Sequence, residues 1–221
     1  MSPLGDLGVI LHYSLLISHH LKSIIMYIHK HIIVGSNIDY YWSKKNKEPI
    51  LEHDNIVIHY SAGSTAISTV NYLVNEKTPV SAHLVIGRDG RIYQLVDFNT
   101  QAWHAGKSQM LGKTGQNAYS VGIELENAGL LQERDKRYYA WFGKRIPDDQ
   151  VIQLVNPQTG FHAWWHTYTE IQLKTLKEVI GLLLYHYKFN RIVGNSEISL
   201  SGKIDPGPAF PLDEFKKLIY R

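Results

Sequence analysis

The chain has 221 residues, of which 44% are hydrophobic and 11% aromatic, enough apolar material for a packed core and too much for a disordered chain. That length suits one domain, or one domain with an extension. The formal net charge of +3 favours an anionic partner such as a cell-wall polymer, and no Lys/Arg stripe indicates nucleic acid. The chain lacks cysteine, which excludes disulfides, thiolate zinc ligands and cysteine nucleophiles, so that any metal must use His, Asp or Glu.

Residues 1–36 are predicted to form an N-terminal extension of uncertain role. The segment from Gly8 to Val34 is apolar but contains several histidines and lysines. A membrane-spanning helix needs about 20 largely uncharged residues, so we expect no integral membrane span. A secretory signal begins with basic residues, which Met1–Asp6 lacks. Without a signal peptide or a lipidation cysteine, a bacterial cytoplasmic location is slightly favoured over the cell envelope.

Residues 37–221 are predicted to form a single α/β domain, in which a central mixed sheet of about five or six strands is flanked by helices. The β-branched run Ile56–Tyr60 predicts a buried central strand. A helix is expected from a cap at Ser64 or Thr65 to about Asn75.

The middle of the chain alternates strand signals with turn residues. Residues 83–96 predict a hairpin around the Asp89-Gly90 turn, and residues 119–126 predict a second central strand. Residues 129–165 are expected to be a long, aromatic loop. An insertion of that kind often forms a substrate wall or a lid.

The last third of the chain contains the strongest helix signal, over residues 168–187. Apolar side chains recur on one face there, and Thr169 with Gln172 forms a capping-box pattern. Residues 191–193 predict a short strand, and residues 212–220 predict a closing amphipathic helix.

A short motif near the C-terminus combines a cation and a carboxylate, Lys203 and Asp205. Pro206 prevents this segment from continuing as a helix. Alternate residues of an extended segment face opposite sides, so a kink at the Pro206-Gly207 pair is needed before both side chains can reach one site. Together with the distant His59, such groups are of the kind that hold a metal ion and stabilise an oxyanion.

Five segments match, in the same order, a known family: residues 57–63, 80–86, 102–108, 117–127 and 194–210. They resemble the zinc-dependent N-acetylmuramoyl-L-alanine amidases, which share their fold with phage lysozyme-type amidases and peptidoglycan recognition proteins. The resemblance covers roughly residues 37–220. It implies an enzyme that cuts the amide between N-acetylmuramic acid and the L-alanine of the stem peptide, with Zn²⁺ as cofactor and peptidoglycan or muropeptide fragments as partners.

The resemblance also implies roles for particular residues. His59 corresponds to the first zinc ligand and Asp205 to the carboxylate ligand, whereas Asn195 stands where the family has its second histidine. Glu124 corresponds to the catalytic carboxylate and Lys203 to the cation that stabilises the transition state. Without the resemblance, a histidine on an apolar strand is usually a core residue, and a lysine is usually solvated.

Glu126 shares its strand face with Glu124 and is the rival for the catalytic role. Burying a carboxylate in an apolar strand is costly without a partner, which favours function, and an ion pair with a core cation is the alternative. We prefer Glu124 because of its position in the family.

Several aromatic residues are expected to bind the substrate. His83, Trp103 and His104 are predicted to line the cleft, and Trp164 and His166 to form its opposite rim.

Asn195 weakens the zinc prediction, because an amide oxygen is a weak donor for zinc compared with imidazole or carboxylate. Asn195 is an engineered replacement of histidine, or the chain is a naturally inactive muropeptide-binding module, or another histidine (His83 or His104) supplies the missing ligand. The leading hypothesis is a peptidoglycan amidase impaired at this position. The alternatives are a non-catalytic binding module and a zinc hydrolase that acts on another amide.

Overall fold

The computed structural model describes residues 26–220 and contains a six-stranded mixed sheet at its centre. In spatial order its strands are β15 (Arg191–Gly194), β4 (Asn55–Tyr60), β9 (Ser120–Leu125), β5 (Leu84–Ile86), β6 (Ile92–Gln94) and β3 (Ile38–Tyr40). The strands β15, β4, β9 and β5 are parallel to one another, and β5 and β6 form the antiparallel hairpin that was predicted. The α/β prediction with two central strands is confirmed.

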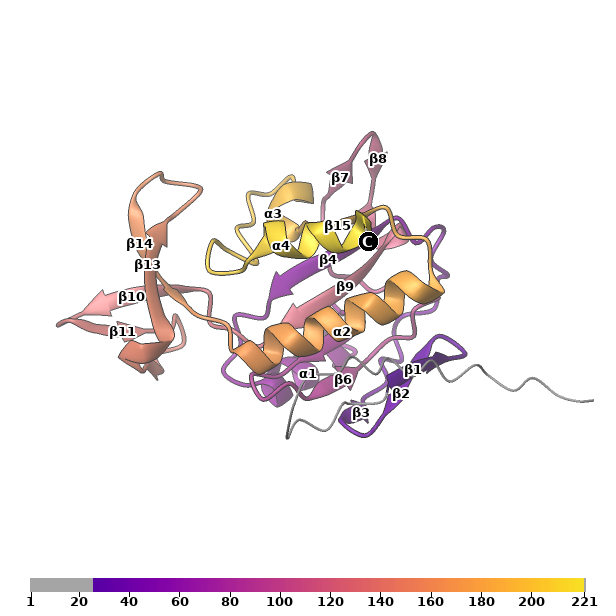
Figure 1. The fold of residues 1–221 in the computed structure, drawn as a ribbon, viewed down its shortest axis with the longest axis horizontal. Helices are drawn as coiled ribbons and strands as arrows, with labels where there is room; N and C mark the ends of the chain where they lie inside the picture. Colours follow the sequence, from indigo (N-terminus) through magenta and orange to yellow (C-terminus); the bar gives the residue numbers. More distant parts are fainter. Residues whose placement is uncertain (1–25, 221) are drawn as a thin grey trace, which may run out of the picture.

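One face of this sheet is covered by α2 (Glu170–His186), as Figure 1 shows. The helix packs against buried β-branched and leucine side chains of β4, β9 and β5. Thr169 caps it by accepting a hydrogen bond from the Gln172 backbone N–H. The Gln172 side chain, however, donates to the backbone oxygens of Ile86 and Glu126, so only half of the predicted capping box forms.

The opposite face is shared between a helix and the residues of the candidate site. The helix α1 (Ala66–Val74) begins after Thr65, whose hydroxyl accepts from the Ser68 backbone N–H, as predicted. It packs against Val85 of β5 and the segment that follows β6. On this face, the carboxyl ends of β4 and β9 carry polar residues.

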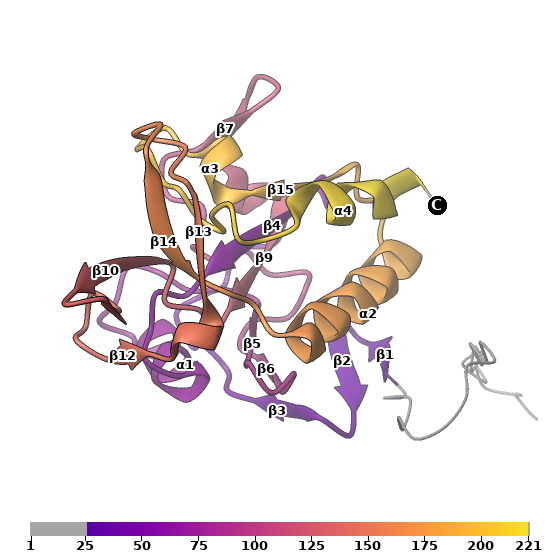
Figure 2. The same ribbon diagram turned by 60° about the vertical axis from the view of Figure 1, so that its left-hand side comes forward.

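Residues 129–165, predicted to be a loop, form a second sheet instead. Its strands are, in spatial order, β12 (Arg145–Ile146), β11 (Arg137–Tyr139), β10 (Leu130–Arg134), β14 (His162–His166) and β13 (Val151–Val155), with the 3₁₀ turn η2 (Asp148–Gln150) before β13. All its pairings are antiparallel. Figures 1 and 2 show this sheet beside one end of the central sheet. Cross-strand aromatic packing, with Tyr138 against Trp164, holds it together.

The N-terminal hairpin of β1 (Met26–His29) and β2 (Ile32–Gly35) packs on α2, and its Ile33 is fully buried in the main core. The hairpin falls within the predicted extension 1–36, and residues 1–25 lie outside the described residues. Between residues 26 and 220 no helix is both long and apolar enough to cross a membrane.

Six short elements complete the fold. They are β7 (Gln109–Met110), β8 (Lys113–Thr114), η1 (Gln116–Ala118), α3 (Asn195–Ile198), α4 (Leu212–Lys216) and η3 (Lys217–Tyr220). The last two form the closing helical segment that was predicted.

Candidate active site

The parallel strands β4 and β9 place His59 and Glu124 side by side, because these two residues are register partners. Their neighbours Ile58 and Ile123 face α2, and side chains alternate along a strand. His59 and Glu124 therefore lie on the opposite face, near the carboxyl ends of their strands, where ligands bind in open α/β sheets.

Asp205 reaches this position from the loop that follows α3. Its Oδ2 lies 2.8 Å from Nδ1 of His59, although the two residues are 146 positions apart in the sequence. Tyr168 secures the loop by donating its hydroxyl proton to the backbone oxygen of Pro206. Gly207 adopts a φ of +73°, and a side chain there would collide with the ring of Trp165. The second sheet thus braces the Asp205 loop.

Asn195 stands at the first turn of α3, next to the same carboxylate. Its Nδ2 donates to Oδ1 of Asp205 at 3.0 Å, and its own Oδ1 is buried without a hydrogen-bond partner among the described residues. The structure therefore brings together the three residues predicted to surround a metal ion: His59, Asp205 and Asn195. That role stays a prediction.

Glu124 has the environment expected of a group that exchanges protons near neutral pH. Its Oε2 is buried and has no partner among residues 26–220. Burial raises the pKa of Glu124 to about 7, with the Asp205 charge adding to the effect and the charges of His59 and Lys203 opposing it. Glu126 accepts instead from the backbone N–H of Arg88, which favours Glu124 for the catalytic role.

His59 is buried, and its surroundings shift its pKa in opposing directions. Burial lowers its pKa, but the charge of Glu124 and the hydrogen bond to Asp205 raise it more, so the net shift is upward. Lys203 is exposed, and its charge lowers the pKa of His59 as well as that of Glu124. Lys203 therefore lies within electrostatic reach of both side chains.

The structure contradicts the cleft-lining role predicted for His83. Its side chain is fully buried, Nδ1 accepts from the Gly122 backbone N–H, and Nε2 donates to the Thr100 carbonyl oxygen. Burial lowers the pKa of His83 to about 4, which keeps the ring neutral. Its position in a matching segment suggested a functional role, but its ring joins two parts of the backbone.

Trp164 and His166 do not join the site either. They lie on the face of β14 opposite Trp165, the residue that contacts the Asp205 loop. Trp164 donates its indole proton to Glu133, and Nδ1 of His166 accepts from the Ala128 backbone N–H. Both side chains pack within the second sheet, and their role at the rim of the cleft stays a prediction.

Trp103 and His104 lie in the loop before β7 and are both partly exposed. The backbone N–H of Trp103 donates to the hydroxyl of Ser81, which holds the loop against the sheet. Nδ1 of His104 lies 3.0 Å from Nε2 of His59, with the two rings edge to face.

Two residues of this region were not predicted. Ser120, on β9, contacts Nε2 of His104 at 3.2 Å. Trp141, 67% exposed, donates its indole proton to the backbone oxygen of Ala62, just beyond β4. The only sequence signal for Trp141 was the aromatic richness of its segment.

The donor set decides whether zinc fits this site. Zinc centres in enzymes use three protein ligands, and here His59 supplies an imidazole and Asp205 a carboxylate, with only an amide at Asn195. His104 contacts the far nitrogen of His59 and cannot replace the missing ligand, and the buried contacts of His83 exclude it too. In the described part of the chain no three His, Cys, Asp or Glu residues are grouped to hold a metal. These residues do not fit a complete zinc centre.

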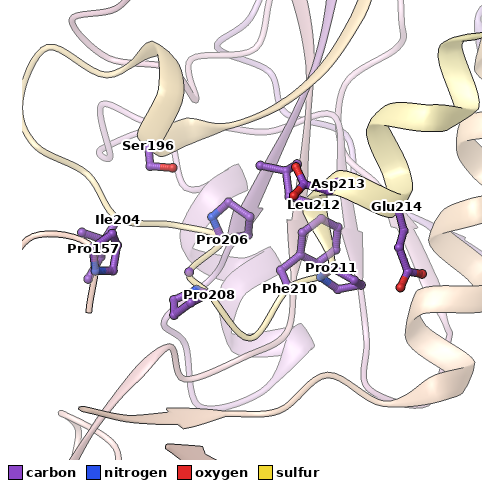
Figure 3. A pocket seen from close by; sticks show the side chains of 11 residues that line it. Pro157, Ser196, Ile204, Pro206, Pro208, Phe210, Pro211, Leu212, Asp213 and Glu214 are labelled. Carbon is purple, nitrogen blue, oxygen red and sulfur yellow. The ribbon is translucent and has the colours of Figure 1, made fainter. Parts of the chain in front are cut away.

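A pocket of about 460 Å³ lies beside residues 204–214 (Figure 3). Pro206, Pro208, Phe210 and the start of α4 line it. Neither His59 nor Glu124 lines this pocket.

Comparison with known proteins identifies the family. The family described as N-acetylmuramoyl-L-alanine amidase matches residues 47–208. The chain belongs to this family. The predicted resemblance is confirmed.

Two curated relatives carry more specific names. The 1,6-anhydro-N-acetylmuramyl-L-alanine amidase AmpD of Citrobacter freundii is 32% identical over 142 residues, which cover 63% of this chain and 57% of that protein. The N-acetylmuramoyl-L-alanine amidase AmiD of Escherichia coli is 32% identical over 163 residues, which cover 71% of this chain and 49% of that protein. The chain thus spans about half the length of these relatives.

The fold recurs in a solved structure, AmpDh3 from Pseudomonas aeruginosa in complex with anhydromuramic pentapeptide. It superposes with a TM-score of 0.53 at 25% identity, covering 74% of this chain and 58% of that one. The predicted fold class is confirmed.

Proposed function

We propose that this chain is a muropeptide amidase, which hydrolyses the amide between N-acetylmuramic acid and the L-alanine of the stem peptide. The observation that carries the proposal is the pairing of His59 with Glu124 across β4 and β9, with Asp205 at 2.8 Å from His59. The names of the relatives support it, and they favour the enzyme over a non-catalytic binding module.

The chemistry follows from the environments of the side chains. Amide hydrolysis needs a group that takes a proton from water and passes one to the leaving nitrogen, and a pKa near the working pH suits that task. Glu124, with a pKa of about 7, meets this requirement. Lys203, whose charge reaches both His59 and Glu124, would stabilise the negative charge that develops on the carbonyl oxygen.

Zinc would supply a polarised water at neutral pH. We infer that this chain holds zinc weakly, because it offers two strong ligands in place of three. Disturbing a residue that only holds a metal ligand in place costs about 10–100-fold in metal affinity or activity, and the loss of a ligand itself should cost more. Asn195 therefore limits the turnover of the chain as it stands.

We further propose anhydro-muropeptides as the substrate class. The support is the name of the Citrobacter freundii relative and the ligand named in the Pseudomonas aeruginosa complex.

The test is peptide release. The chain and its Asn195→His variant are each incubated with zinc and an anhydromuramyl peptide, and free stem peptide is measured by mass spectrometry. The variant should release peptide faster, and Glu124→Gln should abolish release in both backgrounds. Glu126→Gln is the matched control and should keep most activity. No peptide from the Asn195→His form would defeat the proposal.

A further inference from the structure

The turn that joins β11 to β12 carries Trp141, which is 67% exposed and the most exposed of the five tryptophans. Backbone hydrogen bonds close this turn, from the N–H of Ala140 to the oxygen of Lys144 and from the N–H of Gly143 to the oxygen of Ala140. Phe142 packs into the core of the second sheet, and its ring meets the indole at 86° with 5.7 Å between the centroids. The indole is therefore held from below while most of its surface stays in water.

The polar end of the indole is fixed by the loop that follows β4. Its Nε1–H donates to the backbone oxygen of Ala62 at 2.7 Å. Ala62 has a φ of +48°, which residues other than glycine rarely adopt, and its own N–H donates to the backbone oxygen of Asn127 at 3.0 Å. Ala62 follows His59 by three residues, so their backbones are at most about 11 Å apart. Trp141 thus lies beside the candidate active site.

The second sheet also contacts the loop on the other side of the site residues. The ring of Trp165 lies against Gly207, and the side-chain amide of Gln158 donates to the backbone oxygen of Gly202, next to Lys203. In Figures 1 and 2 the carboxyl ends of β4 and β9 point toward this sheet. The sheet is therefore fastened to both loops that surround the candidate site, and it forms a wall beside the catalytic groups.

The chemistry of the exposed indole determines which part of a substrate it suits. Its N–H is the only hydrogen-bonding group of the side chain, and Ala62 already accepts that proton. The ring therefore offers a ligand only its flat carbon faces. These faces are electron-rich, so they attract slightly positive C–H groups and repel carboxylates. A sugar ring has C–H groups along its faces, whereas a peptide presents amides and a terminal carboxylate. The indole of Trp141 therefore suits a sugar ring.

We propose that Trp141 binds the sugar part of the substrate, with a pyranose ring stacked on its indole, and that the second sheet is the sugar-binding wall of the active site. This role rests on the proposed function, because it takes the muramoyl sugar as part of the substrate. It adds a division of labour, since Trp141 recognises the saccharide and makes no contact with the stem peptide.

Separate binding of the two halves of the substrate tests this role without catalysis. The probes are a disaccharide of N-acetylglucosamine and N-acetylmuramic acid, and the free stem peptide. Neither probe contains the amide that is cut, so neither is hydrolysed. Each is titrated into the full chain and followed by ¹H–¹⁵N NMR, in which the indole N–H signal of Trp141 is assigned by its absence from Trp141→Phe. The disaccharide should shift that signal progressively, and the peptide should leave it in place.

Substitutions give the second readout. Trp141→Ala should weaken the affinity for the disaccharide by about 2- to 10-fold, the range expected for the loss of one aromatic contact, and should leave the affinity for the peptide unchanged. Trp141→Phe keeps an aromatic face and should lose less. Trp42→Ala is the matched control, because Trp42 is also exposed but follows β3 at the far edge of the central sheet. That variant should keep both affinities.

Two results would overturn the proposal. One is a Trp141 signal that the disaccharide does not shift at any concentration. The other is a loss of peptide affinity in Trp141→Ala as large as the loss of disaccharide affinity. If Trp141→Ala does not fold, the titrations of the unaltered chain and of Trp141→Phe decide the question. Failure of peptide release with the expected disaccharide response would refute the proposed function alone, and peptide release without that response would refute the role of Trp141 alone.

Discussion

Replacing Gly122, which lies against the ring of His104, by alanine should destabilise the fold, although the same replacement in a strand is normally stabilising. Replacing glycine by alanine inside a strand is normally favourable by roughly 0.5–1 kcal/mol, because the unfolded chain loses freedom. At Gly122 the added methyl group would collide with the His104 ring, and β9 cannot move aside because it lies between β4 and β5. Overpacking of this kind costs about 1–3 kcal/mol. We therefore expect Gly122→Ala to lower the free energy of unfolding by about that amount.

Urea denaturation measures this change, and Gly181→Ala is its control. Gly181 lies exposed in α2 with no atom within 4 Å of the added methyl group, so that variant should be more stable by about 0.8–1.0 kcal/mol. The double variant Gly122→Ala/His104→Ala should lose less than the sum of its parts, since the collision disappears. A Gly122→Ala variant as stable as the unaltered chain would refute the packing of His104 on β9.

Three other predictions concern pH and the substrate. The folded-state pKa of His83 lies near 4, below its ordinary 6.5, so its stabilising effect is complete above pH 6.5 and is lost as the pH falls. Between pH 7.5 and pH 5 it should cost about 2 kcal/mol, and urea unfolding of His83→Gln should show a pH dependence flatter by that amount. Peptide release should fall as the pH drops below about 7, where Glu124 becomes protonated, and Glu124→Gln should reduce kcat by at least about 100-fold. The exposed indole of Trp141, beside Ala62, is expected to contact substrate. Trp141→Ala should therefore raise KM by about 2- to 10-fold and leave kcat nearly unchanged. An unchanged KM would exclude that contact.

The central sheet and its main helix could be predicted because their signals are local. The apolar run at Ile56–Tyr60 predicts β4, and the recurrence of apolar residues on one helix face before Tyr187 predicts α2. Both patterns involve only residues near in the sequence, and both elements form as expected. The second sheet was missed because its strands are short and mostly exposed, so they lack the alternation that marks a half-buried strand. Gln172 was misassigned for a different reason, since its partners at Ile86 and Glu126 are distant in the sequence.

The residues of the candidate site could likewise be predicted only in part from the sequence. The matching segments correctly placed His59, Asp205 and Asn195 together, although only the kink after Asp205 was argued from the residues themselves. The difference between His83 and His104 could not be predicted, because both stand in matching segments. Only the folded backbone shows that one ring joins Gly122 to Thr100 while the other contacts His59.

Asn195 leaves the candidate metal site one strong ligand short of the three that zinc enzymes use. Elemental analysis of the dialysed chain and of Asn195→His, after equal exposure to zinc, measures this directly. We expect well under one equivalent of zinc on the unaltered chain and close to one equivalent on the variant. A full equivalent on the unaltered chain, with none gained in Asn195→His, would contradict it.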